Sequence, residues 1–319
     1  MGPAGGLGMV AAPAAPSSPG LGEPTMSAPT DTVVHDAITR IGVVGSGTMG
    51  AGIAELCALR GLDVHVSVSR ESSLLAAPAR FAASLDRQVA KGRLEAADRD
   101  AALERISVGM DLSELADRDL VIEAGPEDET VKLELFAALD KATAPTAILA
   151  STTSSISITR LAGATARAGR VLGVHFFNPV GVLPLVEIVP TLLSAPEVVD
   201  EVQSFVGTVL GKTCVRAADS SGFIVNALLI PYLLAAVRMV ESGPSTAAEI
   251  DQAMELGCAH PMGPLRLSDL IGLDVVVAIA DSLHAEFKQP QYAAPALLLR
   301  MVEAGLLGRK TGRGFYRHA

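Results

Sequence analysis

The pattern Gly45-x-Gly47-x-x-Gly50 constrains the fold of this chain more than any other stretch of its sequence. It follows an apolar run at 40–45, expected to be a strand, and precedes a helical pattern at 51–61. In such a unit the glycines let the backbone approach a pyrophosphate, and the helix N-terminus offers N–H groups and a positive dipole. The alternative is a glycine-rich turn that binds no ligand. We predict a dinucleotide site formed by Gly45, Gly47, Thr48, Met49 and Gly50.

Short apolar runs alternate with helical patterns along the first two thirds of the chain, which predicts an α/β, Rossmann-type domain with a mainly parallel sheet over 39–221. After Gly222 only helical patterns remain, so we predict an all-α domain over 222–319. The expected strands are 40–45, 63–68, 119–125, 147–152, 170–175 and 185–190, and the expected helices before Gly222 are 51–61, a pair within 71–104, 128–143, 156–167 and 196–210.

The charge and the cysteine content of the chain indicate which partners and which compartment to expect. The formal net charge of −10 comes without a basic patch, so nucleic acid and anionic membranes are not expected partners, and a small substrate is favoured. Cys57, Cys214 and Cys258 lie far apart, which favours reduced thiols and a cytoplasmic location. Residues 1–38 are rich in Gly, Pro, Ala and Ser, and we expect a disordered tail there.

Residues 222–240 are apolar enough to suggest a membrane span. Asn226, Pro231 and Arg238 interrupt the stretch, so we expect a buried helix instead. Its apolar character predicts a helix that is covered on most sides, as at an oligomer interface.

The end of the second expected strand bears on the choice of cofactor. A dinucleotide site that prefers NAD usually has an acidic residue there for the ribose, but Val66 to Arg70 contains no carboxylate. Ser69 and Arg70 offer a hydroxyl and a guanidinium that can bind a 2′-phosphate, so the sequence favours NADP(H) over NAD(H). The alternative is that Arg70 is a surface charge and other groups hold the ribose.

His175 ends an expected strand, at the sheet edge where open α/β sheets bind ligands. Glu187 lies inside the apolar run "LVEIVP", where a buried carboxylate needs a partner. If the two strands are neighbours, the carboxylate can fix one imidazole tautomer and make His175 a general acid/base. A histidine without this partner would more often be structural.

The chain from about Arg40 to Tyr316 resembles the L-3-hydroxyacyl-CoA dehydrogenase family, in particular its bacterial 3-hydroxybutyryl-CoA dehydrogenase members. The resemblance implies a Rossmann-type domain, a helical C-terminal domain that forms homodimers, and reversible hydride transfer between a nicotinamide and the third carbon of an acyl thioester. It is carried by the stretches "GSGTMGAGIA", "DLVIEAGPED", "ASTTSSISI", "GVHFFNPV", "LVEIVP", "GFIVNALLIP", "HPMGPLRLSDLIGLD" and "LGRKTGRGFY".

The resemblance also implies roles for individual residues. His175 is similar to the family's general acid/base and Glu187 to the carboxylate that orients it. The other implied positions are Ser154 at the substrate's 3-oxygen, Asn226 at the substrate carbonyl, Asn178 near the same pocket, Glu127 and Lys132 at the nicotinamide side of the cofactor, and Arg87 near the coenzyme A phosphates. For Arg87 a solvated helix face is the alternative, as it is for Arg80, Lys91 and Arg93.

The sequence departs from the family at several positions. Thr152 replaces an asparagine, Ser221 a proline and Ala227 an arginine. Val68 stands for the ribose-binding aspartate, and Asn226 lies one residue further from Glu187 than the family pattern has it. These changes leave the acid/base pair intact and bear on substrate scope and cofactor choice.

The sequence leaves two other functions open. A dehydrogenase for a hydroxyacyl group on an acyl carrier protein has the same site, and a non-catalytic dinucleotide-binding protein has the same fold. No metal-ligand spacing occurs, so no metal site is expected. We identify no carboxylate partner for the remaining histidines and expect them to be structural or at the surface: His35, His65, His260, His284 and His318.

Overall fold

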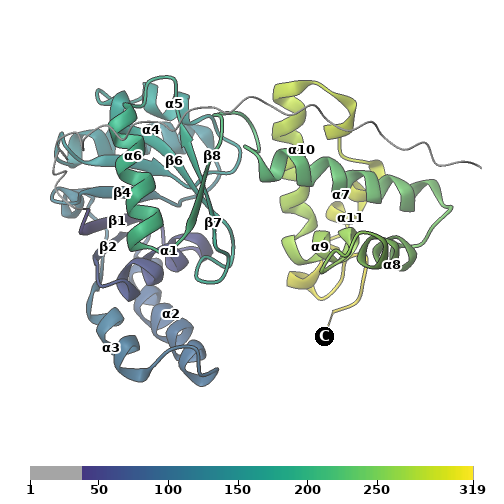
Figure 1. The fold of residues 1–319 in the computed structure, drawn as a ribbon, viewed down its shortest axis with the longest axis horizontal. Helices are drawn as coiled ribbons and strands as arrows, with labels where there is room; N and C mark the ends of the chain where they lie inside the picture. Colours follow the sequence, from purple (N-terminus) through teal and green to yellow (C-terminus); the bar gives the residue numbers. More distant parts are fainter. Residues whose placement is uncertain (1–37, 319) are drawn as a thin grey trace, which may run out of the picture. The chain divides into compact units, whose positions relative to one another are not determined.

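The computed structural model describes residues 38–318. The tail predicted for residues 1–38 therefore lies outside the described residues except for Ile38, and so does His35. Ile38 is buried against the sheet. The described chain forms a strand-containing part up to about residue 221, followed by helices, turns and two isolated β-bridges (Figure 1).

Within residues 38–318, eight strands form one sheet in the order β3-β2-β1-β4-β5-β6-β7-β8. The strands from β3 to β6 are parallel, β7 is antiparallel to β6, and β8 is parallel to β7. The strand order reverses between β1 and β4, and such a switch point is where open α/β sheets bind ligands. The strands are β1 (Arg40–Val44), β2 (Asp63–Ser67), β3 (Ile106–Gly109), β4 (Leu120–Glu123), β5 (Ile148–Ser151), β6 (Val171–Phe176), β7 (Leu185–Pro190) and β8 (Thr213–Arg216).

This topology confirms the predicted Rossmann-type fold, but the sequence missed β3 and β8. Both are four-residue strands at the two edges of the sheet. An edge strand has a neighbour on one side only, and all four residues of β8 are at least partly exposed. Neither strand therefore shows the continuous apolar run that marks the central strands.

Helices connect the strands as the sequence predicted, with α2 and α3 forming the expected pair within 71–104. Helix α1 begins at Thr48 rather than at residue 51, so Thr48, Met49 and Gly50 form its first turn. The helices of this part are α1 (Thr48–Leu59), α2 (Glu71–Ala90), α3 (Ala96–Glu104), α4 (Glu129–Ala142), α5 (Ile158–Gly163) and α6 (Pro196–Ser204), the last continued by a π-helical turn at Phe205–Val209, with 3-10 turns at Leu112–Leu115 and Ala168–Arg170.

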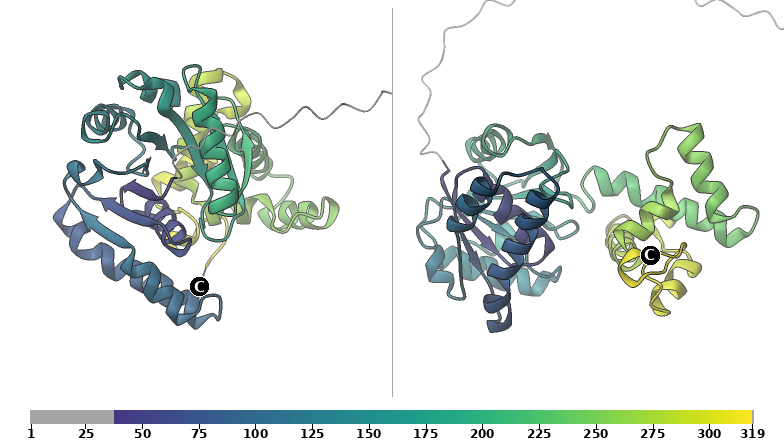
Figure 2. Two further views of the ribbon diagram at one scale, coloured as in Figure 1. Left: turned by 60° about the vertical axis from the view of Figure 1, so that its left-hand side comes forward. Right: turned by 90° about the horizontal axis from the view of Figure 1, so that it is seen from below.

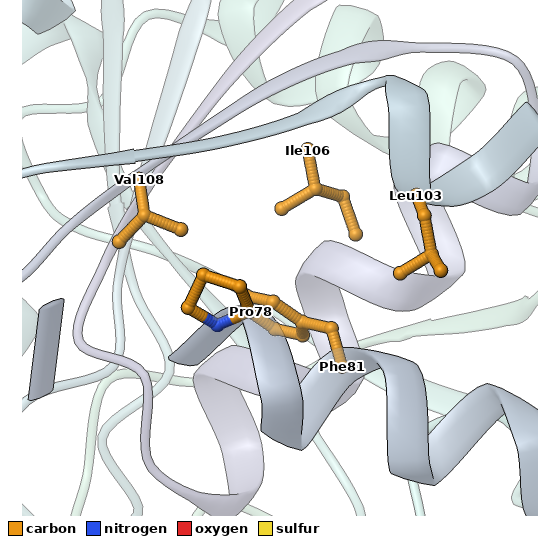
Figure 3. A pocket seen from close by; sticks show the side chains of 5 residues that line it. All are labelled: Pro78, Phe81, Leu103, Ile106 and Val108. Atoms are coloured by element: carbon orange, nitrogen blue, oxygen red, sulfur yellow. The ribbon is translucent and has the colours of Figure 1, made fainter. Parts of the chain in front are cut away.

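A small cavity of about 170 Å³ lies between α2, α3 and β3 (Figure 3). Its lining side chains are apolar: Pro78, Phe81, Leu103, Ile106 and Val108. These side chains offer no charge or hydrogen bond that could orient a ligand, so the cavity is a feature of packing beside the sheet edge.

The part of the chain after Gly222 consists of helices joined by short connections (Figure 2). These helices have a hydrophobic core of their own, with buried residues from Ile230 to Met301. Gly243 ends α7 with a φ of +88°, a conformation in which glycine has no Cβ penalty. The helices are α7 (Val225–Ser242), α8 (Ala247–Gly257), α9 (Pro264–Ile271), α10 (Leu273–Phe287) and α11 (Ala296–Glu303), with 3-10 turns at Pro290–Tyr292 and Arg309–Thr311.

Helix α7 is only partly covered within the described chain. The sequence predicts a helix covered on most sides, as at an oligomer interface, and 33% of the helix is buried within residues 38–318. Its length and composition alone would suit a membrane span, but one such helix is weak evidence, because core helices of other proteins have the same length and composition. Ile224, Leu228 and Met239 are 39%, 71% and 48% exposed, so an apolar face of this helix remains uncovered in the single chain.

The residues that follow the last helix fold back onto α9. Asp269 of α9 is fully buried and accepts hydrogen bonds from the backbone N–H groups of Phe315 and Tyr316, each at 2.9 Å. His318 Nε2 also lies 2.9 Å from Asp269 Oδ2. The Tyr316 hydroxyl donates to Asp251 of α8 at 2.7 Å. These bonds tie the segment 314–318 to two helices.

Candidate active site

The phosphate loop between β1 and α1 has the geometry that the glycine pattern predicts. Gly45 has a φ of +103°, and a Cβ there would lie 2.7 Å from the carbonyl oxygen of Ala124. A Cβ on Gly50 would lie 1.9 Å from the carbonyl oxygen of Gly45, so the helix can approach the strand only because Gly50 lacks one. A Cβ on Gly47 would meet no described atom within 4 Å, and no side chain caps α1. The open space at Gly47 and the uncapped helix end fit a pyrophosphate.

The end of β2 presents Ser69 and Arg70 at the surface, with Arg70 as the N-cap residue of α2. Val68 is 4% exposed and packs in the core of the sheet. The Val68 side chain therefore offers no hydrogen bond to a ribose, and its correspondence to the family's ribose-binding aspartate stays a prediction. Ser69 is the nearest exposed position after β2.

Arg80 is a residue of this region that the sequence did not single out from the solvated face of α2. Its guanidinium Nη1 donates a hydrogen bond to the carbonyl oxygen of Ser46, inside the phosphate loop. No carboxylate pairs with Arg80 in the described residues. The spacing of basic residues along α2 gave no signal for this contact, because it depends on where α2 passes the loop.

His175 and Glu187 are directly opposed residues of the antiparallel strands β6 and β7. Their side chains meet, with Nδ1 of His175 2.7 Å from Oε2 of Glu187. Both are buried, at 5% and 0% exposure. The rings of Phe177 and Phe223 lie edge-on to the imidazole, with centroids 4.6 and 5.3 Å away. The contact leaves Nε2 as the imidazole nitrogen that can exchange a proton with a substrate.

The second oxygen of Glu187 is also engaged. Its Oε1 accepts hydrogen bonds from the backbone N–H groups of Ile224 and Val225, each at 3.0 Å, at the start of α7. Burial raises the pKa of Glu187, but the hydrogen bonds from His175, Val225 and Ile224 outweigh it and hold the pKa below its ordinary value. Glu187 is therefore a carboxylate that keeps its charge and its orientation beside His175.

Ser154 lies in the loop after β5, and Glu127, which lies in the loop after β4, holds its backbone. Oε1 of Glu127 accepts hydrogen bonds from the backbone N–H of Ser154 at 3.1 Å and from the hydroxyls of Thr153 and Ser155. Burial raises the pKa of Glu127, but the ammonium of Lys132 and these hydrogen bonds lower it further than burial raises it. The Ser154 hydroxyl forms no hydrogen bond within residues 38–318.

Lys132 does not extend freely toward a ligand. It is 1% exposed, and its Nζ contacts both carboxylate oxygens of Glu123 at 2.6 and 2.7 Å and Oε2 of Glu127 at 3.5 Å. The sequence did not single out Glu123. The signal was present, because Glu123 is a carboxylate within the apolar run "LVIEAG", as Glu187 is within "LVEIVP".

Asn226 is 9% exposed and follows Val225, whose N–H binds Glu187. Its side-chain amide forms no hydrogen bond in the described chain, so its donor and acceptor are both unused. Asn178 lies in the exposed loop that follows β6.

The departures from the family pattern have local structural roles. The hydroxyl of Thr152 accepts a hydrogen bond from the backbone N–H of Phe176 at 3.2 Å and so joins the ends of β5 and β6. The backbone N–H of Ser221 donates to Glu286 at 3.0 Å. The backbone N–H of Ala227 donates to the carbonyl of Gly222 at 3.1 Å.

Arg87 lies in the last turn of α2 and forms no hydrogen bond within residues 38–318, although its charge acts on a buried neighbour. Glu55 of α1 is 7% exposed and accepts a hydrogen bond from the Ser84 hydroxyl at 2.9 Å. Burial raises the pKa of Glu55, and Ser84 and Arg87 offset part of that rise. The structure does not bring Arg87 into contact with His175.

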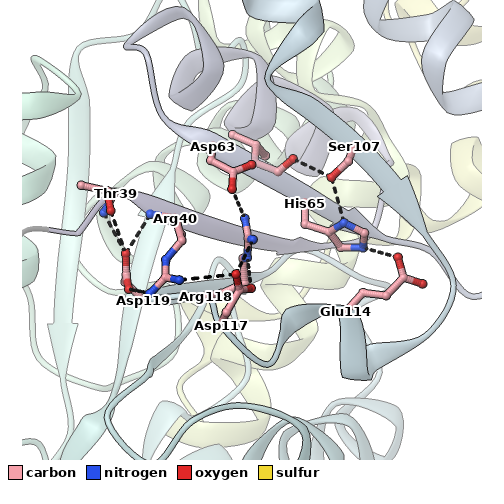
Figure 4. Close-up of polar contacts among 10 residues, drawn as sticks. Thr39, Arg40, Asp63, His65, Ser107, Glu114, Asp117, Arg118 and Asp119 are labelled. Carbon is pink, nitrogen blue, oxygen red and sulfur yellow. Dashed lines mark hydrogen bonds and ion pairs between the residues drawn. The ribbon is translucent and has the colours of Figure 1, made fainter.

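Two of the remaining histidines, His65 and His318, have carboxylate partners that the sequence did not reveal. His65 has Ser107 Oγ 2.9 Å from Nδ1 and Glu114 Oε2 3.3 Å from Nε2 (Figure 4). Burial lowers the pKa of His65, although Glu114 acts against it. His318 pairs with Asp269. In the described residues no group of three or more His, Cys, Asp or Glu side chains could hold a metal ion.

Comparison with known proteins gives the same family in both parts of the chain. Residues 40–220 match the family model of the 3-hydroxyacyl-CoA dehydrogenase NAD-binding domain, and residues 222–318 match that of its C-terminal domain. The chain is 55% identical over 286 residues to a 3-hydroxybutyryl-CoA dehydrogenase of Mycobacterium tuberculosis, covering 89% of this chain and 100% of the relative. It is 42% identical over 277 residues to a 3-hydroxybutyryl-CoA dehydrogenase of Clostridioides difficile, covering 87% of this chain and 98% of the relative.

A solved structure supports the same conclusion. The crystal structure of (S)-3-hydroxybutyryl-CoA dehydrogenase from Ralstonia eutropha matches with a TM-score of 0.84 and 42% sequence identity, covering 89% of this chain and 100% of that one. The resemblance that the sequence suggested is thereby confirmed. With its dinucleotide loop, its opposed histidine and glutamate, and both family domains in order, this chain belongs to the 3-hydroxyacyl-CoA dehydrogenase family.

Proposed function

We propose that the protein catalyses reversible hydride transfer between NADP(H) and C3 of a short-chain 3-hydroxyacyl or 3-oxoacyl thioester, with acetoacetyl-CoA and (S)-3-hydroxybutyryl-CoA as the substrate pair. The observation that carries the proposal is the contact between Nδ1 of His175 and Oε2 of Glu187 at 2.7 Å. The names of the relatives support the substrate class. The open phosphate loop at Gly47 supports the dinucleotide.

The nicotinamide ring, when bound, supplies the hydride that reaches C3 in the reductive direction. His175 donates the proton from Nε2 to the oxygen on C3 as negative charge develops there, and Glu187 holds Nδ1–H and stabilises the imidazolium. In the oxidative direction the neutral imidazole takes this proton back. The reaction therefore consumes one hydride and one proton when it forms the alcohol.

Ser154 and Asn226 are proposed to bind the substrate. Both have unused hydrogen-bonding groups in residues 38–318, and each lies beside a residue that contacts a carboxylate of the site. The Ser154 hydroxyl is assigned to the 3-oxygen and the Asn226 amide to the thioester carbonyl, with Asn178 near the same pocket. Preorganised donors of this kind stabilise charge that develops in the transition state.

The preference for NADP(H) over NAD(H) belongs to the proposal. It rests on Ser69 and Arg70, which are exposed at the end of β2 and leave no carboxylate there to repel a 2′-phosphate. Arg80, which contacts the phosphate loop, adds a second cation to this region. Glu127 and Lys132 are assigned to the nicotinamide side, and Arg87 to the coenzyme A phosphates.

The assembly is proposed to be a cytoplasmic homodimer formed through the helices after Gly222. The apolar face of α7 that remains uncovered, with Leu228 71% exposed, supports a second copy of the chain as its cover. A hydroxyacyl group on an acyl carrier protein is the second candidate substrate, for which the departures at Thr152 and Ala227 leave room.

The test is the loss of nicotinamide absorbance with purified protein and acetoacetyl-CoA, run in parallel with NADPH and NADH at equal concentrations. Rapid oxidation of NADPH with little oxidation of NADH supports the reaction and the cofactor preference. Faster oxidation of NADH keeps the reaction and refutes the preference. If neither cofactor is oxidised, the coenzyme A substrate is wrong, and the same assay is repeated with acetoacetyl-acyl carrier protein.

A further inference from the structure

Glu123, the last residue of β4, is a fully buried carboxylate at the switch point of the sheet. It lies opposite Val44 of β1 and Ser151 of β5, so it is placed between the phosphate loop and the loop that carries Ser154. A carboxylate in such a position is costly unless it is paired and hydrogen-bonded.

Each oxygen of Glu123 has two partners. Oε1 accepts hydrogen bonds from Lys132 Nζ and from the backbone N–H of Gly125, both at 2.6 Å. Oε2 accepts hydrogen bonds from Lys132 Nζ at 2.7 Å and from the Ser151 hydroxyl at 2.6 Å. Three residues therefore satisfy the carboxylate: Lys132 of α4, Gly125 of the turn after β4, and Ser151 at the end of β5. The contact with Glu123 is also the shortest ion pair of Lys132 in the described residues.

Two chains of contacts lead from Glu123 to Ser154. In the first, Lys132 lies 3.5 Å from Glu127, which binds the backbone N–H of Ser154 at 3.1 Å. In the second, the Ser151 hydroxyl accepts a hydrogen bond from the backbone N–H of Thr153 at 3.1 Å while it donates to Glu123. The residue before Ser154 and the backbone of Ser154 itself are therefore both held through Glu123.

The turn that follows Glu123 also touches the phosphate loop. The backbone N–H of Ala124 donates to the carbonyl of Val44 at 2.8 Å. The carbonyl oxygen of Ala124 approaches Gly45 so closely that a Cβ on Gly45 would lie 2.7 Å from it. Glu123 and the turn after it therefore contact both the phosphate loop and, through Ser151, the loop that carries Ser154.

We propose that Glu123 is a positioning residue, which sets the place of the Ser154 hydroxyl through Lys132 and Ser151 and does not itself touch substrate or cofactor. The inference rests on the proposed function for its kinetic consequence, because Ser154 is assigned there to the substrate oxygen. Its structural consequence, a fixed conformation of residues 152–155, holds for any reaction of this site.

The first experiment compares Glu123→Gln with Asp119→Asn. Asp119 precedes the same strand at its opposite end and binds the backbone N–H groups of Thr39 and Arg40 at 3.0 and 2.8 Å (Figure 4). Asp119→Asn therefore serves as the control, because it also removes one carboxylate charge but does so outside the site. Hydrogen exchange of residues 152–155 is expected to quicken at least several-fold in Glu123→Gln and to stay unchanged in Asp119→Asn. Equal exchange in the two variants would overturn the proposal, whatever substrate the enzyme uses.

The second experiment is a double-substitution cycle in the acetoacetyl-CoA assay. Glu123→Gln is expected to lower kcat by roughly 10- to 100-fold, since small misplacements of a substrate-binding group cost about this much. Ser154→Ala should then reduce kcat much less in the Glu123→Gln background than in the unsubstituted enzyme, because Ser154 is already misplaced. An equal fold-loss in both backgrounds would mean that Glu123 supports the fold only, and the proposal would be wrong.

Ser151→Ala keeps the inference testable if Glu123→Gln does not fold. This variant removes the link between Glu123 and Thr153 without leaving Lys132 unpaired. Ser151→Ala is expected to quicken hydrogen exchange in residues 152–155. Ser154→Ala should also reduce kcat less in the Ser151→Ala background than in the unsubstituted enzyme. Failure of the proposed function gives a different pattern, in which the unsubstituted enzyme lacks activity and the exchange difference persists.

Discussion

Glu187 accepts a hydrogen bond from the backbone N–H of Val225 at 3.0 Å, which joins the central part of β7 to the first turn of α7. The other oxygen of the same carboxylate binds His175. One side chain therefore fixes both the orientation of the imidazole and the start of the helix that carries Asn226. Loss of its charge is expected to affect stability as well as catalysis.

Glu187→Gln is expected to reduce the free energy of unfolding by about 2 kcal/mol near pH 7, the usual scale for a hydrogen-bonded buried charge. The folded state holds the pKa of Glu187 below its ordinary value of 4.5. Its stabilising contribution is therefore complete above about pH 4.5 and is lost as the pH falls through the lower, folded-state pKa. Urea unfolding at several pH values measures this, with exposed Glu303→Gln as control. If the difference in unfolding free energy between Glu187→Gln and the unsubstituted protein grew toward acid pH, the lowered pKa of Glu187 would be wrong.

His175→Gln is expected to lower kcat and kcat/KM together, by roughly 10²- to 10⁴-fold, because the proton transfer occurs in the transition state. Steady-state kinetics with acetoacetyl-CoA measures the loss. His260→Gln serves as the control, since His260 contacts Tyr232 in the helical part and not the site. If kcat of His175→Gln stayed within a few-fold, the general acid/base would have to be another group.

Ser69→Asp is expected to shift the cofactor preference toward NADH. A carboxylate at this exposed position would repel a 2′-phosphate and accept hydrogen bonds from a free ribose, so kcat/KM for NADPH should fall by about 10- to 100-fold. Ser69→Asn is the matched uncharged control. An unchanged ratio of the two cofactors in Ser69→Asp would show that the 2′-position is recognised elsewhere.

Arg80→Gln is expected to weaken binding of the dinucleotide by about 10-fold, because it removes a cation that contacts the phosphate loop. Quenching of cofactor fluorescence gives the Kd directly, without substrate. The control is Arg93→Gln, an exposed position past the end of α2. A loss restricted to coenzyme A binding would reassign Arg80 to the substrate, and unchanged binding of both would leave it a surface residue.

Leu228→Lys is expected to convert the proposed dimer to a monomer, because it places a charge on the exposed apolar face of α7. Sedimentation velocity at several protein concentrations measures the change. Leu192 is 95% exposed in the loop after β7, so Leu192→Lys is a matched control away from the helices. Identical sedimentation of Leu228→Lys and the unsubstituted protein would refute this interface.

The sequence predicted the central strands, the helices and the glycine loop because each has a strong local signal. β6 and β7 are continuous apolar runs, and Gly45 and Gly50 occupy positions where the chain itself approaches too closely for a Cβ. β3 and β8 escaped prediction because an edge strand of four residues carries little apolar signal.

The site could be predicted from the sequence where a carboxylate stands within an apolar run, because a buried carboxylate needs a partner. Glu187 in an apolar run implied His175, and the same logic applied to Glu123 would have implied Lys132. The contact of Arg80 with Ser46 could not be read this way, because it depends on the path of α2 past a loop 34 residues earlier. The core position of Val68 likewise required the strand's observed orientation.

The tie between Asp269 and the segment 314–318 has a consequence for how the chain is made. Phe315, Tyr316 and His318 supply hydrogen bonds to this buried carboxylate, and they are synthesised after every helix of their domain. While residues 314–318 are still inside the ribosomal exit tunnel, Asp269 lacks these donors, so the helices can associate but cannot complete their packing around it. The packing around Asp269 is therefore completed only after this segment has emerged, later than the helices that the segment joins.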